Sequence, residues 1–128
     1  RGDGVTPYYV DKNFKTVADK NIADTLYEVG KGMGLTIHRG KAWTTDALLR
    51  ETREIVEAKR KEGARVVDMV SSTLLTIAQT YNIKAGSILA VSDNVITGEM
   101  GFMNPLYYMA ESNILKIALA TVKKLEGK

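Results

Sequence analysis

The chain of 128 residues carries 18 basic and 15 acidic side chains, which gives a net charge of +3. This balance, with no basic stretch beside stacking aromatics, argues against a nucleic-acid partner. The absence of cysteine excludes disulfides, thiolate metal sites and cysteine nucleophiles. No apolar run approaches the roughly 18 residues that a membrane span needs. We therefore expect a cytoplasmic protein without a membrane partner, with a single domain over residues 1–128.

The first part of the chain predicts two strands and one helix. Residues 5–10 are rich in β-branched and aromatic side chains and predict a strand. Apolar residues recur at helical spacing over 20–31, which predicts a helix with Asp19 as its cap. Apolar and polar side chains alternate over 35–42, and this alternation predicts a second strand.

The middle of the chain predicts a helix, a strand and a second helix. Thr45 and Asp46 can cap a helix over 47–62, whose dense charges indicate a solvated outer face. A short strand is predicted over 64–67. Apolar residues spaced at helical intervals over 70–81 then predict a helix that is buried along one side.

The last part of the chain predicts a buried strand and a long helix. Residues 87–91 form a nearly continuous apolar run, typical of a strand that is covered on both faces. A loop is predicted over 94–104. Asn104 and Pro105 are typical of a helix start, so a helix is predicted over 106–125. Strands that alternate with helices indicate an α/β fold with a parallel or mixed sheet.

Asp93 is the sharpest candidate for chemistry. It follows the predicted strand 87–91, and open α/β sheets bind ligands at the carboxyl ends of their strands. Partial burial would let its carboxyl group hold or share a proton near neutral pH. The alternative is a turn aspartate that caps its own loop, because Ser-Asp-Asn is also ordinary turn chemistry.

A second candidate region follows the predicted strand 64–67. Asp68 could cap the next helix or bind a sugar hydroxyl, and Met69 could form an apolar wall or belong to the core. Thr44 and its neighbours could offer backbone N–H groups to a polar ligand, or cap a helix. His38 is the only histidine, so no histidine pair exists and we expect no metal site.

Four runs of residues carry a family resemblance when their order and spacing are taken together. The runs are Arg1-Gly2-Asp3-Gly4, Trp43-Thr44-Thr45-Asp46-Ala47 with Arg50-Glu51-Thr52 behind it, Val67-Asp68-Met69 and Val91-Ser92-Asp93. Over nearly the whole chain they resemble the carboxyl-terminal half of the type-I nucleoside phosphorylases. This family holds uridine phosphorylase and purine nucleoside phosphorylases. The second run resembles the uridine branch and the last run the purine branch, so base preference stays open.

The resemblance implies a mixed, partly barrel-like sheet flanked by helices, present here as a partial domain. It implies cleavage of a nucleoside by phosphate into a free base and ribose 1-phosphate. Phosphate would be a co-substrate, with no other cofactor. The expected partners are a nucleoside, phosphate, a missing amino-terminal half and further copies of the chain.

The resemblance also implies roles for individual residues. Asp93 matches the catalytic acid that donates to a purine ring nitrogen as negative charge develops on the leaving base. Met69 matches a residue that packs on the ribose. The substrate-binding residues that the resemblance implies are Leu48, Val67, Asp68, Met69 and Ser92.

The chain departs from the family pattern at three points. Val70 stands where the signature has a glutamate that binds the ribose hydroxyls, and losing such a charged hydrogen bond costs about 1.5–3 kcal/mol. A helical arginine that assists the acid is not evident near Leu106 and Tyr107. The phosphate-binding segments lie in the family's amino-terminal half. Three hypotheses stay open: an active phosphorylase that needs its missing half, a catalytically silent binding or assembly module, and a related hydrolase.

Overall fold

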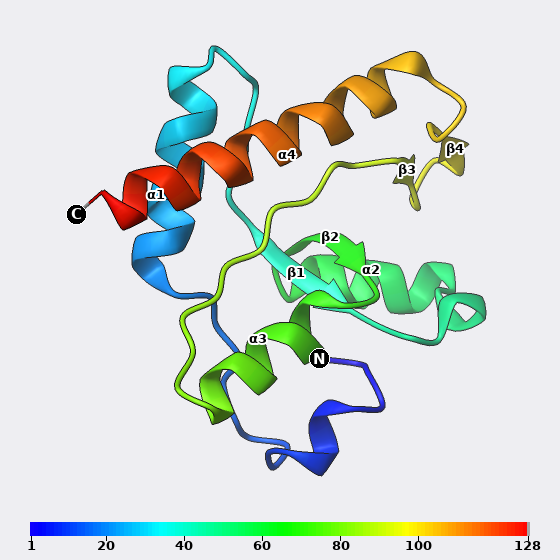
Figure 1. Cartoon of the computed structure of the whole chain (residues 1–128). Helices are drawn as coiled ribbons and strands as arrows, with labels where there is room; N and C mark the ends of the chain where they lie inside the picture. The colour runs from blue at the N-terminus through cyan, green and yellow to red at the C-terminus, as the bar shows by residue number, and fades with distance from the viewer. Residues whose placement is uncertain (128) are drawn as a thin grey trace. The chain divides into compact units, whose positions relative to one another are not determined.

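The chain forms two compact units in the computed structural model, which describes residues 1–127. Of the described residues, the first unit comprises 1–19 and 40–86, and the second comprises 20–39 and 87–127. Figure 1 shows helices with only short strands between them. No helix within the described residues has the length and apolar character that crossing a bilayer requires.

The first unit is built on two parallel strands, β1 (Lys41–Thr44) and β2 (Ala64–Asp68). Thr44 lies beside Asp68 in the register, so both strands end at the same edge. A parallel bridge between Gly2 and Thr45 brings the start of the chain to that edge as well. The carboxyl ends of three segments therefore meet, as they do where parallel sheets bind their ligands.

Two helices complete the first unit. α2 (Arg53–Lys61) connects the strands and begins at Thr52, whose hydroxyl accepts from the backbone N–H of Ile55. α3 (Ser71–Thr80) follows β2 and contacts β1. Thr76 on α3 is fully buried and shares a hydrogen bond of 2.7 Å with the hydroxyl of Thr16.

The second unit is built on the packing of α1 (Lys20–Gly32) against α4 (Pro105–Glu126). Leu26 and Ile117 are buried in this packing. A Cβ atom at Gly30 would lie 2.9 Å from Ile37 and 3.2 Å from Ile117. A larger residue at position 30 would therefore displace the ends of these isoleucine side chains.

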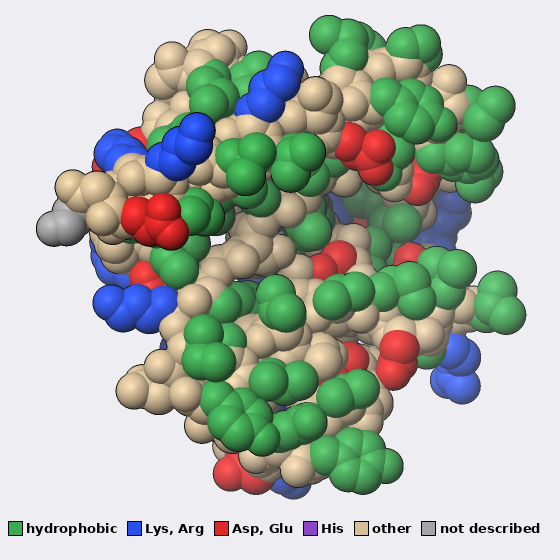
Figure 2. Space-filling view, viewed as in Figure 1, with side chains coloured by type: hydrophobic (Ala, Val, Ile, Leu, Met, Phe, Trp, Pro, Cys, Tyr) green, Lys and Arg blue, Asp and Glu red, His purple; other side chains and the backbone are tan. Residues whose placement is uncertain are grey.

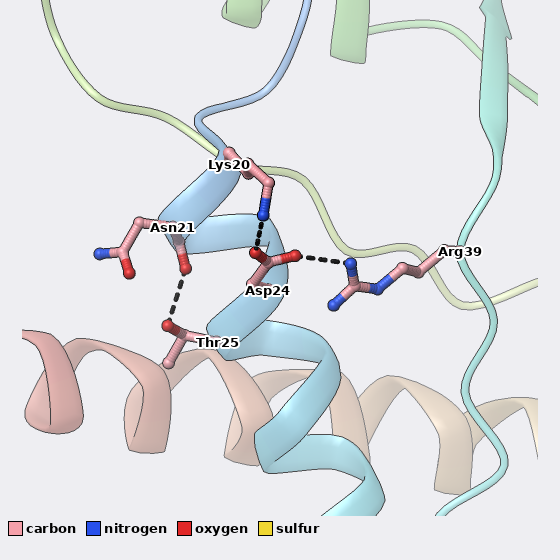
Figure 3. A network of polar contacts seen from close by, with 5 residues as sticks. All are labelled: Lys20, Asn21, Asp24, Thr25 and Arg39. Carbon is pink, nitrogen blue, oxygen red and sulfur yellow. Dashed lines mark hydrogen bonds and ion pairs between the residues drawn. The ribbon is translucent and has the colours of Figure 1, made fainter.

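A polar network covers the outer side of α1 (Figure 3). The carboxylate of Asp24 forms ion pairs with Lys20, one turn earlier, and with Arg39. Hydrogen bonds from Lys20 and Arg39 lower the pKa of Asp24. The guanidinium of Arg39 also lies 4.4 Å from the ring centroid of Tyr27, within cation–π range. These contacts fix the segment that follows α1.

A short hairpin precedes α4 in the second unit. Its strands are β3 (Asp93–Asn94) and β4 (Glu99–Met100), which pair antiparallel. Gly98 has φ +74° and closes the turn, a conformation that favours glycine. Asn104 then caps α4, because its side-chain oxygen accepts from the backbone N–H of Leu106 at 2.9 Å.

The α/β class is confirmed: within residues 1–127, one parallel strand pair lies in the first unit and one antiparallel pair in the second, and each unit also contains helices. The helices predicted over 20–31, 70–81 and 106–125 are present with small changes at their ends. The strand predicted over 64–67 is also confirmed. These elements carry strong local signals in caps and apolar spacing.

Two predictions in the first half are wrong in extent or type. Residues 5–10 form no strand but contain η1 (Thr6–Tyr8), a 3-10 turn in which Asp3 accepts from the backbone N–H of Thr6. The strand predicted over 35–42 begins only at Lys41, where pairing with β2 starts. A strand forms only where a partner supplies its hydrogen bonds.

Two further predictions need correction. The helix predicted over 47–62 is divided into η2 (Leu48–Arg50) and α2. The apolar run 87–91 forms no strand, because no neighbour pairs with it within residues 1–127. Val91 is accordingly 67% exposed. The predicted loop 94–104 instead holds the second strand of the hairpin.

Large hydrophobic side chains remain on the surface (Figure 2). One set lies along α4, opposite the side that packs on α1, at intervals of three to seven residues. The exposed apolar residues of this set are Tyr108, Leu115, Leu119 and Val122. A helix that is apolar on two opposite sides is typical of one that is covered on both.

Candidate functional site

The first candidate region lies at the carboxyl edge of β1 and β2. Asp68 accepts two hydrogen bonds there, from the hydroxyl of Thr44 at 2.6 Å and from the backbone N–H of Ser71 at 2.9 Å. The hydroxyl of Thr44 in turn accepts from the backbone N–H of Ser72 at 3.0 Å. Asp68 therefore caps α3, one of the two roles that the sequence allows. Each carboxylate oxygen keeps a further lone pair, so sugar binding stays a prediction.

The residues that follow Asp68 face outward. Met69 is 51% exposed and Val70 is 62% exposed, so both are accessible at the start of α3. Val67 is half-buried on β2, and Leu48, on η2, is exposed. Val67, Asp68 and Met69 thus lie together at one strand end, while Leu48 comes from the segment after β1.

A buried carboxylate that the sequence did not single out lies at the same edge. Asp3 is 9% exposed and accepts from the hydroxyls of Ser72 and Thr73 on α3. It also accepts from the backbone N–H and the hydroxyl of Thr6, at 2.7 and 3.2 Å, and from the backbone N–H of Val5. We refer to Asp3, Thr6, Ser72 and Thr73 as the Asp3 cluster.

The Asp3 cluster has a clear electrostatic consequence. Burial by itself would raise the pKa of Asp3, because it disfavours the charged form. The hydrogen bonds from Ser72, the backbone of Thr6 and Thr73 outweigh burial and hold the pKa at about 2. Asp3 is therefore ionised at neutral pH and joins the chain start to α3.

Two signals in the sequence could have revealed this cluster. Asp3 is followed three residues later by Thr6, the spacing of a side chain that caps a turn. The start of α3 carries three consecutive hydroxyl residues, Ser71, Ser72 and Thr73. Their pairing across about seventy residues of chain is a tertiary contact, which spacing alone does not show.

The second candidate region is an open hollow of about 270 Å³ in the second unit. Asp93 lines it together with Ser92, Glu99, Asn104 and Tyr107. The side chain of Asp93 is exposed, so the partial burial expected from the sequence is not observed.

Asp93 is held in place by its own hairpin. One oxygen accepts from the hydroxyl of Ser92 at 2.6 Å, and the other accepts from the backbone N–H of Gly101 at 3.1 Å. A Cβ atom at Gly101 would clash with the carbonyl oxygen of Ser92, so this close approach requires glycine. Asp93 thus combines the turn role that the sequence allows with exposure to an open hollow.

Tyr107 adds a second polar group to this hollow. It lies in the first turn of α4, and its hydroxyl donates to Glu111 one turn later at 2.6 Å. This hydrogen bond, partial burial and neighbouring negative charges, including Asp93, raise the pKa of Tyr107. Its hydroxyl is therefore protonated at neutral pH. No group of three or more His, Asp or Glu side chains in residues 1–127 is arranged to hold a metal ion.

Solved structures identify the class of protein to which this fold belongs. The fold matches that of the P. knowlesi homologue of P. falciparum PNP with a TM-score of 0.80 at 23% identity, over 98% of this chain and 50% of that one. It also matches an AMP nucleosidase from Bacteroides thetaiotaomicron with a TM-score of 0.78 at 20% identity, over 98% of this chain and 51% of that one. The shared class is therefore an α/β fold found in purine nucleoside phosphorylases and nucleosidases.

The sequence identifies the family. The pattern of the phosphorylase superfamily matches residues 1–122, and the chain belongs to this superfamily. It is 33% identical over 87 residues to a DeoD-type purine nucleoside phosphorylase of Bacillus cereus, across 68% of this chain and 37% of that protein. A DeoD-type relative from Bacillus mycoides is 32% identical over the same shares. The resemblance read from the motifs is confirmed, and the chain matches less than half the length of these curated relatives.

Proposed function

We propose that this chain supplies the part of a nucleoside phosphorylase that faces the base and the ribose. The observation that carries the proposal is the run Val67-Asp68-Met69, which ends a parallel strand in a chain that belongs to the phosphorylase superfamily. In the proposed reaction, a phosphate oxygen forms a bond to the anomeric carbon of the nucleoside. The glycosidic C–N bond breaks, and its electron pair leaves with the base. The products are a free base and ribose 1-phosphate.

The roles of the side chains follow from the charge that develops on the leaving base. Asp93 would donate to a ring nitrogen of the base, which stabilises that charge. Ser92 would orient this side chain, because its hydroxyl donates to one carboxylate oxygen of Asp93. Met69 would pack on the ribose, Asp68 would accept from a sugar hydroxyl, and Leu48 and Val67 would contact the nucleoside.

Phosphate is the co-substrate in this proposal, and no other cofactor is required. The matched relatives extend well beyond the part that this chain covers. The family resemblance implies that phosphate binding falls to the amino-terminal half of the enzyme, which would be an obligatory partner of these residues.

Val70 supports a second candidate function. It is 62% exposed directly after Met69, and its side chain offers no hydrogen-bond acceptor to a ribose. Without this acceptor, phosphorolysis would be weaker. Alternatively, the protein would bind nucleosides or assemble with partners without catalysis. Cleavage by water is the third candidate, and the fold shared with an AMP nucleosidase supports it.

The test is cleavage of inosine and uridine by the full-length protein with and without inorganic phosphate. Release of base and ribose 1-phosphate only with phosphate is the expected result. Equal cleavage without phosphate would assign the hydrolase, and nucleoside binding without cleavage would assign the silent module.

Val70→Glu in the same protein tests how much cleavage depends on the hydrogen-bond acceptor that Val70 lacks. We expect cleavage to increase about tenfold or more, which corresponds to one charged hydrogen bond. Val70→Leu is the matched control, since it changes the same exposed position without adding an acceptor. No gain with Val70→Glu would count against a phosphorylase that is merely weakened.

We further propose that the protein associates with other copies of itself. The apolar residues exposed along α4 support this, because large apolar patches usually mark interfaces. Size-exclusion chromatography with light scattering should give an oligomer. A stable monomer at micromolar concentration would contradict the proposal.

A further inference from the structure

The segment 87–91 combines strand-like exposure of its side chains with an unpaired backbone. Ile88 and Ala90 are half-buried, whereas Leu89 and Val91 between and after them are 41% and 67% exposed. This period of two is typical of a β-strand, whose successive side chains point to opposite faces. Figure 1 shows the segment as part of a long connection between α3 and β3, outside any helix or sheet. Within residues 1–127, no backbone group of residues 88–91 has a hydrogen-bond partner.

The composition of this segment is that of an interior strand. It reads Ser-Ile-Leu-Ala-Val and contains no charged residue and no proline. Strands at the edge of a sheet usually carry charges, proline or a bulge, which prevent pairing with other chains. A strand without these features, and with apolar side chains on its outer face, is suited to a covered position between neighbours. The segment 87–91 therefore lacks both hydrogen-bond partners and a cover for Leu89 and Val91.

The solved structures that share this fold indicate what could supply both. They match 98% of this chain, but the match takes up only 50% and 51% of their own chains. The complete fold therefore contains about as many residues again as the part seen here. A second copy of this chain adds none of those residues. A strand from the remaining half of the fold is accordingly the occupant that the comparison favours.

We propose that residues 87–91 are a docking strand for the amino-terminal half of the protein, which pairs with this segment and covers Leu89 and Val91. This inference rests on the proposed function for its partner, since that half is the one the proposed reaction requires. Ser92 and Asp93 follow the segment directly and line the hollow. Pairing fixes the strand end from which Asp93 extends, so docking of the other half also positions the proposed acid.

Hydrogen–deuterium exchange on the full-length protein tests the pairing. The amides of residues 88–91 should exchange at least about 100-fold more slowly than those of an unfolded chain, because paired strand amides exchange only when the structure opens. Val66 and Val67, which are paired in β2, are the protected control. Dilution of the protein should not change the rates. Free exchange at 88–91 would overturn the proposal, and protection that disappears on dilution would overturn it in favour of a second copy.

Two isosteric variants of the full-length protein test the cover. Val91→Thr should lower the thermal midpoint by roughly 3 °C or more, because its hydroxyl would be buried without a partner. Val95→Thr makes the same change at a valine that is 45% exposed and lies between β3 and β4, outside the segment. It should shift the midpoint by less than about 1 °C. Equal midpoints in the two variants would overturn the cover over Val91.

The cleavage assay separates this inference from the proposed function. Protected amides at 88–91 in a protein that cleaves no nucleoside would uphold the docking strand and overturn the proposed function. Phosphate-dependent cleavage by a protein in which these amides exchange freely would overturn the docking strand and leave the proposed function intact.

Discussion

Two carboxylates, Asp3 in the first unit and Asp93 in the second, have different surroundings. Asp3 is 9% exposed and accepts five hydrogen bonds from the protein itself. Asp93 is exposed, accepts two and lines a hollow of about 270 Å³. A carboxylate whose acceptor positions are filled by its own chain has a structural role. A carboxylate with free positions beside a hollow is available to a ligand.

The largest effect that follows from this comparison is a loss of stability in Asp3→Ala. The change leaves the buried hydroxyls of Ser72 and Thr6 and the half-buried hydroxyl of Thr73 without their acceptor. We expect the free energy of unfolding to fall by about 3 kcal/mol, measured by urea denaturation. Asp93→Ala, at an exposed site, should change it by less than about 0.5 kcal/mol. Equal losses of stability in both variants would contradict the distinction between a structural Asp3 and an accessible Asp93.

The pH dependence of stability sharpens the same contrast. The pKa of Asp3 is about 2 in the folded chain, against 3.8 for an unperturbed aspartate. A lowered folded-state pKa stabilises the protein above the unfolded value, and this stabilisation is lost as the pH falls from about 4 to about 2. The difference between the two pKa values corresponds to about 2.5 kcal/mol of the free energy of unfolding. Denaturation of wild type and Asp3→Asn across this range should show a larger loss in wild type, because the other carboxylates with lowered pKa values, such as Asp24, titrate in both proteins.

Two glycines of the second unit offer a further comparison. Alanine at Gly101 would clash with the carbonyl of Ser92, whereas Gly32, at the end of α1, has nothing within 4 Å of the added Cβ atom. We expect Gly101→Ala to lower the free energy of unfolding by about 2 kcal/mol and to displace Asp93. Gly32→Ala should be neutral or stabilising by up to roughly 1 kcal/mol. Thermal denaturation of both variants measures the difference, and similar midpoints would contradict it.

The smallest effect is expected at Asp24. Its ion pairs with Lys20 and Arg39 lie on the surface, where solvent and salt screen them. Asp24→Asn should shift the thermal midpoint less than any variant above, and added salt should remove the remaining shift. A shift as large as that of Asp3→Ala would show that surface charge pairs matter as much as the buried Asp3 cluster.

The sequence predicted the elements that have strong local signals. α4 begins where Asn104 and Pro105 predict it, and α3 follows the apolar spacing after β2. Strands were harder to predict, because the run 87–91 needs a neighbour that local pattern does not reveal. The Asp3 cluster was missed for a related reason, since its bonds join residues about seventy positions apart. Asp93 lines an open hollow, its functional role stays a prediction, and its exposure was not foreseen.

The most direct test of the account is phosphate-dependent base release by the full-length protein, in wild type and Asp93→Asn. The account predicts that wild type forms ribose 1-phosphate only when phosphate is present. It predicts that Asp93→Asn folds with wild-type stability and loses about 100-fold or more in rate. A wild-type rate in Asp93→Asn, or base release that does not depend on phosphate, would contradict the account.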